Sequence, residues 1–172
     1  MPMELVELLE RGTVVLPLEA RDKWEAIRTL TMSLVEAGKL PAERFEEVHR
    51  ALVEREKELS TGMEKGIAVP HAGVDMPGEA LGALGLAPQG IPFECLDGEP
   101  ARIIFLMVTP KDKKLRHLRT LSTIVRVLAH EGLRRKLLEC SSTEEVMRVL
   151  QEREEELLKE GGPWPGRRSP SS

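Results

Sequence analysis

The sequence predicts a three-layer α/β sandwich in which a central mixed β-sheet is flanked by helices. Two helical patterns precede a block of apolar, strand-like segments, and further helical patterns follow that block. The last apolar segment, residues 103–108, contains no polar residue. We therefore expect it to be a central strand that is covered on both faces.

The first strand and the first helix are expected between residues 13 and 37. Residues 13–18 (TVVLPL) are β-branched and apolar, which favours a short strand. Asp22 and Glu25 have the spacing of a capping box, which predicts a helix that begins here, runs to about Ala37 and is ended by Gly38.

A second helix is expected directly afterwards, with Pro41 as its first residue and its end near Leu59. The polar, glycine-containing residues 60–66 predict a loop. Strands are then predicted at residues 67–69 and 80–86, before the central strand at 103–108.

An amphipathic helix is expected at residues 114–129, after Pro110 ends the central strand, and Gly132 is expected to break the helical pattern. A final helix should begin at the capping box formed by Ser142 and Glu145. The apolar stripe of the amphipathic helix consists of Leu118, Leu121, Ile124, Val125 and Leu128.

Composition excludes several classes of function. The chain has 172 residues, a charged fraction of 31% and a net charge of −4, which suit one globular domain. The mild acidity argues against a nucleic-acid partner. The acidic N-terminus and the absence of a long apolar run predict a cytoplasmic protein without membrane insertion. Cys95 and Cys140 lie far apart, so we expect reduced, packed thiols.

One of the four histidines stands out in GIAVPHAG, residues 66–73. Pro70 has no N–H, so we expect strand pairing to end there and His71 to lie on a loop at the strand tip. Gly66 and Gly73 leave the neighbouring backbone open to a partner or an anion. An ordinary surface histidine is the alternative interpretation.

The other three histidines have different settings. His117 begins the amphipathic helix at the edge of its apolar stripe and is placed to face the sheet. His49 lies in a highly charged helix, and His130 is expected near a helix C-terminus, where a cation is favourable. His117 is therefore the second candidate site residue.

Three ordered motifs resemble one known family: residues 55–73, 91–110 and 117–128. They are similar to the enzyme IIA domain of the fructose, mannitol and nitrogen-regulatory class of the bacterial phosphoenolpyruvate-dependent phosphotransferase system. The resemblance covers about residues 5–150. It implies a type-2 enzyme IIA domain over residues 1–152, followed at 153–172 by a helical extension and a disordered tail containing Trp164.

The resemblance also implies the roles of three residues. His71 matches the histidine that accepts a phosphoryl group from the histidine-containing phosphocarrier protein, and His117 matches the second histidine that stabilises it. Arg55 matches the active-site arginine. Independently, a neutral imidazole is a nucleophile, and phosphoryl transfer needs mainly placement and electrostatic donors.

The hydroxyls of Ser60 and Thr61 are expected to complete the phosphate cradle, with no metal or cofactor required. Each residue has a plainer interpretation. Arg55 would then pair with Glu54 or Glu58 on a charged helix, and residues 60–62 would only terminate that helix.

The family has two branches. We expect the nitrogen-regulatory type, whose members bind targets such as transporters and sensor kinases. The alternative is a fructose- or mannitol-type component that passes the phosphoryl group to a cysteine of a IIB domain. For either branch, Met63, Val74 and Met76 are candidates for an exposed apolar ring that meets the phosphocarrier. Burial of these three side chains is the alternative.

Two alternatives from other classes stay open. His71 and His117 with a carboxylate such as Asp75 or Asp112 would form a catalytic metal site of a hydrolase, although no HxxxH or HxH spacing supports it. A binding module that keeps the fold without carrying phosphate is the other.

Overall fold

A computed structural model describes residues 4–160 of the chain. The central sheet has five strands in the order β1-β4-β5-β2, and β3 also pairs with β5. The strands are β1 (Thr13–Val15), β2 (Ile67–Ala68), β3 (His71–Val74), β4 (Leu81–Ile91) and β5 (Ala101–Pro110).

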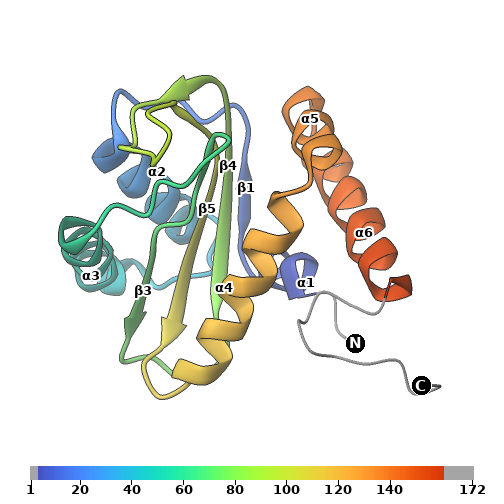
Figure 1. Cartoon of the computed structure of the whole chain (residues 1–172). Helices are drawn as coiled ribbons and strands as arrows, with labels where there is room; N and C mark the ends of the chain where they lie inside the picture. The colour runs from blue at the N-terminus through green and yellow to red at the C-terminus, as the bar shows by residue number, and fades with distance from the viewer. Residues whose placement is uncertain (1–3, 161–172) are drawn as a thin grey trace.

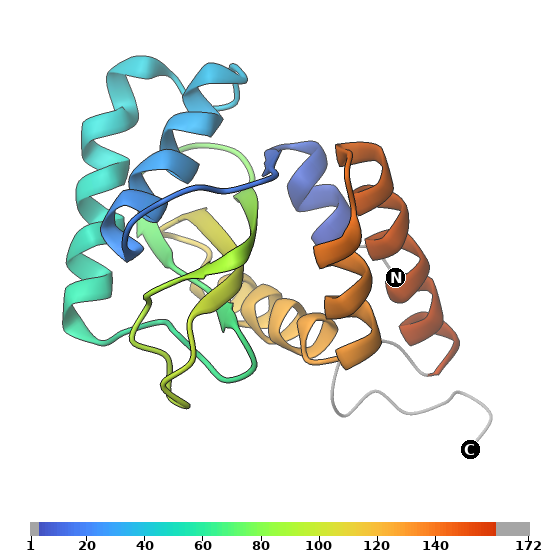
Figure 2. The same cartoon turned by 90° about the horizontal axis from the view of Figure 1, so that it is seen from above.

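Helices cover both faces of this sheet, as the two views show (Figures 1 and 2). One buried cluster joins the sheet to α2 and α3, and a second joins its other face to α1, α4, α5 and α6. The predicted three-layer sandwich is therefore confirmed. The helices are α1 (Glu4–Glu10), α2 (Lys23–Glu36), α3 (Phe45–Glu58), α4 (Lys114–Leu128), α5 (Glu131–Glu139) and α6 (Thr143–Lys159).

The sheet is mixed, as predicted. Strand β4 runs parallel to β1 and antiparallel to β5, whereas β2 and β3 run parallel to β5. Strand β5 thus lies inside the sheet, and every one of its residues except Arg102 is buried. This confirms the expected central strand and extends it to residues 101–110.

Several element boundaries differ from the prediction. Strand β1 ends at Val15, and Leu18 returns to the sheet through its N–H, which donates to the Leu86 carbonyl. Pro41 precedes a short 3-10 helix, Ala42–Arg44, so α3 begins only at Phe45. A short 3-10 turn at a helix start is common.

The expected interruption near Pro70 is present, since β2 ends at Ala68 and β3 begins at His71, but the expectation that His71 lies on a loop is wrong. Pro70 lacks an N–H, but its carbonyl accepts a hydrogen bond of 2.9 Å from the Met107 N–H. The next residue, His71, already belongs to β3 and pairs in register with Met107. His71 is therefore held by the sheet itself.

The C-terminal half contains two further corrections. Leu118 was expected in the buried stripe of α4, but it is 62% exposed. It lies about 120° around the helix axis from the fully buried Ile124, at 100° per residue. Gly132 does not break the pattern but lies in α5, where His130 is the N-cap and its Nδ1 accepts from the Leu133 N–H.

The N-cap half of each predicted capping box is confirmed. The side chain of Asp22 accepts from the Glu25 N–H at the start of α2, and Ser142 accepts from the Glu145 N–H at the start of α6.

Cys95 and Cys140 are free thiols. No helix among residues 4–160 is long and apolar enough to cross a membrane. The expected tail with Trp164 lies outside the described residues.

Candidate active site

His71 is oriented by its own strand. Its Nδ1 lies 2.8 Å from the carbonyl oxygen of Val69, and the ring is half-buried. A carbonyl can only accept a hydrogen bond, so the neutral ring carries its proton on Nδ1. The lone pair of the neutral imidazole is therefore on Nε2, the nitrogen available for attack.

His117 faces His71 from the first turn of α4. The two ring centroids are 5.3 Å apart in an edge-to-face arrangement. The Nδ1 of His117 lies 2.5 Å from the hydroxyl of Thr109 at the end of β5. A strand and a helix thus bring the two predicted histidines to one place.

Both histidines have lowered pKa values. Burial is the main cause for His71, and the positive charge of Arg55 adds to it, while the hydrogen bond to Val69 and the charge of Glu56 act in the opposite direction. Burial and the neighbouring His71 lower the pKa of His117 to about 4. Both rings are therefore neutral at pH 7, as nucleophilic attack requires.

Arg55 joins the two histidines at one open cavity of about 810 Å³. It lies near the end of α3, and its Nη1 donates to the carbonyl oxygen of Leu59 at 2.9 Å. No ion pair within residues 4–160 links Arg55 to Glu54 or Glu58. The simpler interpretation of Arg55 as a partner in a charged helix surface is thus not what the structure shows.

Further charged and apolar side chains line the same cavity. Lys111 in the β5–α4 connection and Lys114 at the start of α4 contribute two positive charges, and Leu118 contributes an exposed apolar surface. Sequence analysis assigned Leu118 to the apolar stripe of α4 and did not propose Lys111, Lys114 or Thr109 for the site. Local sequence patterns do not show that these three residues lie beside the histidines.

Ser60 and Thr61, which were expected to complete the phosphate cradle, are not among the residues that line this cavity. The Ser60 hydroxyl donates to the Phe93 carbonyl at 2.8 Å and accepts from the Gly62 N–H. The Thr61 hydroxyl lies 2.5 Å from Glu56 Oε1, and its N–H donates to Glu56 Oε2 at 2.8 Å. Both hydroxyls are thus committed to fixing the loop.

A buried charge network binds the loop that contains Ser60 and Thr61. Glu56 lies on the inner face of α3, is 1% exposed, and also forms an ion pair of 3.3 Å with the buried Lys23 of α2. Lys23 forms a second ion pair of 2.9 Å with Glu94. Because Glu56 and Arg55 are adjacent, the network fixes the end of the helix that carries the arginine.

Gly62 is required by the close packing of this loop. A Cβ atom there would lie 2.7 Å from the carbonyl oxygen of Phe93 and 2.9 Å from Cys95 Cα. Backbone atoms cannot yield to such a contact without moving the chain. The Ser-Thr-Gly motif therefore has a packing explanation as well as its family resemblance.

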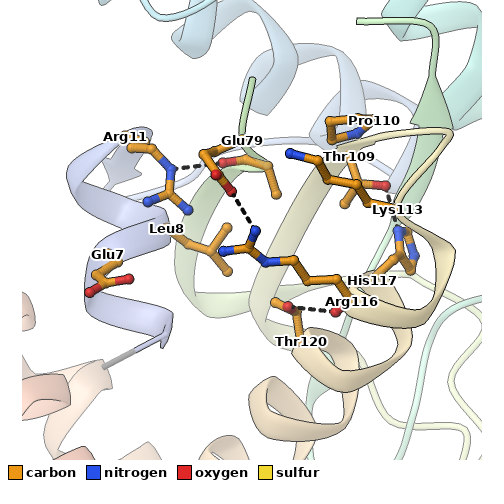
Figure 3. A pocket seen from close by; sticks show the side chains of 11 residues that line it. Glu7, Leu8, Arg11, Glu79, Thr109, Pro110, Lys113, Arg116, His117 and Thr120 are labelled. Atoms are coloured by element: carbon orange, nitrogen blue, oxygen red, sulfur yellow. Dashed lines mark hydrogen bonds and ion pairs between the residues drawn. The ribbon is translucent and has the colours of Figure 1, made fainter. Parts of the chain in front are cut away.

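A second, smaller cavity lies on the other side of His117, and Thr109 and His117 line both cavities. In Figure 3, Arg116 is directed at Glu79, with which it forms an ion pair of 3.2 Å. Arg11 and Lys113 donate to the carbonyl oxygens of Ala80 and Gly78. The three cationic side chains that line the smaller cavity therefore all bind other groups of the protein.

The metal alternative gains no support from this geometry. Neither Asp75 nor Asp112 lines the cavity that holds His71 and His117. The described residues contain no group of three or more histidine, cysteine, aspartate or glutamate side chains that could hold a metal ion.

The expected apolar ring of Met63, Val74 and Met76 is also corrected. Val74 is only 2% exposed, and the two methionines are partly buried against the core clusters. Since β3 continues to Val74, every second side chain of this stretch points into the core. The exposed apolar side chains beside the site are instead Leu115 and Leu118 on α4.

Comparison with known proteins identifies the family of the chain. Residues 7–153 match the family model of the "Phosphoenolpyruvate-dependent sugar phosphotransferase system, EIIA 2". The chain belongs to this family.

Relatives include both sugar-specific and regulatory proteins. The fructose-specific EIIA component of Haloferax volcanii is 35% identical over 151 residues, which cover 88% of this chain and 92% of that protein. The fructose-specific EIIABC component of Bacillus subtilis is 32% identical over 86% of this chain, which spans only 23% of that longer protein. The crystal structure of the nitrogen regulatory protein IIA-Ntr from Neisseria meningitidis superimposes with a TM-score of 0.75 at 29% identity, covering 85% of this chain and 98% of that one.

Proposed function

We propose that the protein is a phosphoryl carrier that accepts a phosphoryl group on Nε2 of His71. The observation that carries the proposal is the shared cavity of His71, His117 and Arg55, with the Nδ1 of His71 committed to the Val69 carbonyl. This arrangement leaves one nucleophilic nitrogen beside two groups able to donate hydrogen bonds. The donor is the histidine-containing phosphocarrier protein, a partner that family membership supports.

The transfer needs no cofactor in this proposal. The lone pair on Nε2 of His71 forms the new N–P bond while the N–P bond of the donor breaks, and the electron pair of that bond returns to the donor imidazole. The proton on Nδ1 stays hydrogen-bonded to Val69 and stabilises the positive charge that develops on the ring. The phosphorylated ring of the donor carries a proton on its other nitrogen, so it leaves as a neutral imidazole. One neutral histidine is consumed and one is released, so the charges balance.

Arg55 and His117 would stabilise the transferred group. Charge in this reaction is spread over the three equatorial oxygens of the phosphoryl group, where preorganised donors act most effectively. The guanidinium of Arg55 carries a permanent positive charge, and His117 supplies a ring N–H. Lys111 and Lys114 add positive potential at the same cavity.

The surface around the cavity suits a protein partner. Leu115 and Leu118 are one helical turn apart and both exposed, at 76% and 62%. An apolar pair beside charged residues is the usual composition of a transient interface. We infer that this part of α4 contacts the phosphocarrier.

Two roles of the phosphorylated protein are supported by its relatives. A nitrogen-regulatory role, in which the phosphorylation state controls binding to a sensor kinase or transporter, is supported by the likeness to IIA-Ntr. Transfer to a cysteine of a IIB domain is the second candidate, and the 35% identical fructose-specific relative supports it. Incubating the phosphorylated protein with a fructose-type IIB domain separates these two roles by the presence or absence of transfer.

The central proposal is tested by phosphorylation with phosphoenolpyruvate, enzyme I and the phosphocarrier. Intact mass spectrometry should show the acid-labile gain of one phosphoryl group, and His71→Ala should abolish it. His49→Ala is the matched control, because His49 is half-buried on α3 outside the cavity and stacks on Phe45. An unmodified wild type, as a pure binding module would give, or an equally labelled His71→Ala variant would overturn the proposal.

A further inference from the structure

The hydroxyl of Thr109 has one hydrogen-bond partner in the described part of the chain, the ring of His117. Thr109 is 3% exposed, and its Oγ1 lies 2.5 Å from His117 Nδ1. Figure 3 marks this contact with a dashed line. It is carried by β5, the strand next to the one that holds His71. The residue thus ties the second histidine to the strand beside the first.

A hydroxyl differs from the carbonyl that binds His71. The Val69 carbonyl only accepts, so it fixes the proton of His71 on Nδ1. The Thr109 hydroxyl is able to donate as well as accept, so it can bind His117 with the proton on either ring nitrogen. The direction of this one hydrogen bond therefore decides which tautomer His117 adopts.

We propose that Thr109 is a positioning residue for phosphoryl transfer: its hydroxyl donates to Nδ1 of neutral His117, so that His117 keeps its proton on Nε2 and presents an N–H to the phosphoryl group on His71. This inference rests on the proposed function of His71. The two histidines would then have opposite tautomers, with a lone pair on Nε2 of His71 and a proton on Nε2 of His117.

Three observations support this assignment. The Nε2 atoms of both rings have no hydrogen-bond partner among residues 4–160, so both are free for the reacting group. Both rings line the same cavity. A neutral His117 is needed for a tautomer to exist at all, and the low pKa of this ring, about 4, ensures it at pH 7.

The opposite direction of the hydrogen bond would work against transfer. If His117 donated from Nδ1 to Thr109, its Nε2 would carry a lone pair. That lone pair would face the anionic oxygens of the phosphoryl group and repel them. The hydroxyl of Thr109 has no acceptor other than His117 in the described structure, so donation to Nδ1 also satisfies a buried polar group.

The test compares Thr109→Val, Thr109→Ser and a control. Valine keeps the shape of threonine but cannot donate, whereas serine restores the hydroxyl. Thr123→Val is the matched control, because Thr123 is also 3% exposed and its hydroxyl donates to the Arg119 carbonyl inside α4. Two quantities are measured: the ring ¹⁵N chemical shifts of His117, which report its tautomer, and the rate of phosphorylation of His71 by the phosphocarrier.

We expect the wild type, Thr109→Ser and Thr123→Val to show His117 with its proton on Nε2. Thr109→Val should show a mixture of tautomers and a rate lowered about tenfold. This loss is smaller than the roughly 100-fold or more expected for a group that itself transfers a proton, because part of the His117 population keeps the required tautomer. A wild-type His117 with its proton on Nδ1 would overturn the proposal. So would a Thr109→Val variant with unchanged tautomer and rate, or a serine variant that restores neither.

The tautomer measurement also keeps this inference separate from the proposed function. It needs no phosphoryl donor, so it reports on Thr109 and His117 in the unmodified protein. A wild type that shows the expected tautomer but is never phosphorylated would overturn the function of His71 and, with it, the role of Thr109 in transfer. A wild type that is phosphorylated but has the proton of His117 on Nδ1 would overturn only the proposed role of Thr109.

Discussion

The imidazole rings of His71 and His117 lie edge to face with 5.3 Å between their centroids, although one belongs to a strand and the other to a helix. At this distance a positive charge on one ring opposes a charge on the other. The pKa of His117 is lowered to about 4 by burial and by this neighbour. The pair is therefore built to be neutral at pH 7.

This pair predicts how the stability of the protein depends on pH. Between about pH 4 and 6.5, His117 is neutral in the folded protein but protonated in the unfolded chain, so the unfolded state binds more protons. The free energy of unfolding should therefore rise with pH across this window and level off above it. His71 and His49, whose pKa values are also lowered, contribute in the same direction.

Urea denaturation at a series of pH values measures this effect. His117→Gln should have a shallower rise than the wild type between pH 4 and 6.5, because glutamine does not titrate. Identical pH profiles for the two proteins would show that the ring of His117 titrates normally in the folded state.

Arg55→Ala should lower the phosphorylation rate of His71 about 100-fold, the range expected for removing one preorganised donor to a developing anion. The comparison is Arg50→Ala, which removes an exposed arginine of the same helix that does not line the cavity. Rapid-quench measurement of the transfer from the phosphocarrier gives both rates. Equal rates for the two variants would show that Arg55 does not contribute to the transfer.

Leu115→Asp should weaken recognition of the phosphocarrier without changing the chemistry, because Leu115 is 76% exposed on α4 but does not line the cavity. Loss of an apolar contact at a transient interface typically costs enough to raise the KM for the partner about tenfold. Leu96→Asp is the control, since Leu96 is 80% exposed on the β4–β5 connection and does not line the cavity. The maximal rate should stay the same in both variants, and a raised KM in Leu96→Asp alone would place the interface elsewhere.

Removing one member of the buried Lys23–Glu56 pair should be costly for stability. Glu56→Leu leaves the Lys23 ammonium buried with only Glu94 as an ionic partner and deprives the Thr61 hydroxyl and N–H of their acceptor. The expected loss is about 3–5 kcal/mol in the free energy of unfolding, measured by urea denaturation.

The exposed ion pair between Arg21 and Glu25 supplies the comparison for this prediction. Arg21→Ala should change stability little, because exposed pairs are screened by solvent. If Glu56→Leu were as stable as Arg21→Ala, the network would not be what holds the end of α3.

Local patterns explain why much of the fold could be predicted from the sequence. The Asp22 and Ser142 caps depend on a side chain and a backbone N–H three residues later, so the sequence alone contains both partners. The central strand is visible because its residues are apolar on both faces. Helix α1 and helix α5 were not predicted, because the first is short and the second contains a glycine in its first turn.

The predictions that were wrong concern contacts between elements that lie far apart in the sequence. Pro70 lacks a donor, but the sequence does not show that its carbonyl receives the Met107 N–H. The rotation of α4 on the sheet decides that Leu118 is exposed, and this rotation depends on packing against distant residues. Local periodicity carries no information on either contact.

Three of the residues that the sequence proposes for the site lie together in the structure. Ordered motifs identified His71, His117 and Arg55, which the structure brings to one cavity. The hydroxyl directions of Ser60 and Thr61 were not predictable, because they depend on Glu56, which looks like one more charged residue of an exposed helix. Thr109 gave no signal because it ends an apolar strand and becomes distinctive only when His117 lies beside it.

The most direct test of the central claim is NMR spectroscopy of the phosphorylated, ¹⁵N-histidine-labelled protein. Because Nδ1 of His71 is hydrogen-bonded to Val69, the phosphorus should be coupled to Nε2 of His71 and to no other nitrogen. A phosphorus atom coupled to Nδ1 of His71, or to a nitrogen of His117, His49 or His130, would contradict the account.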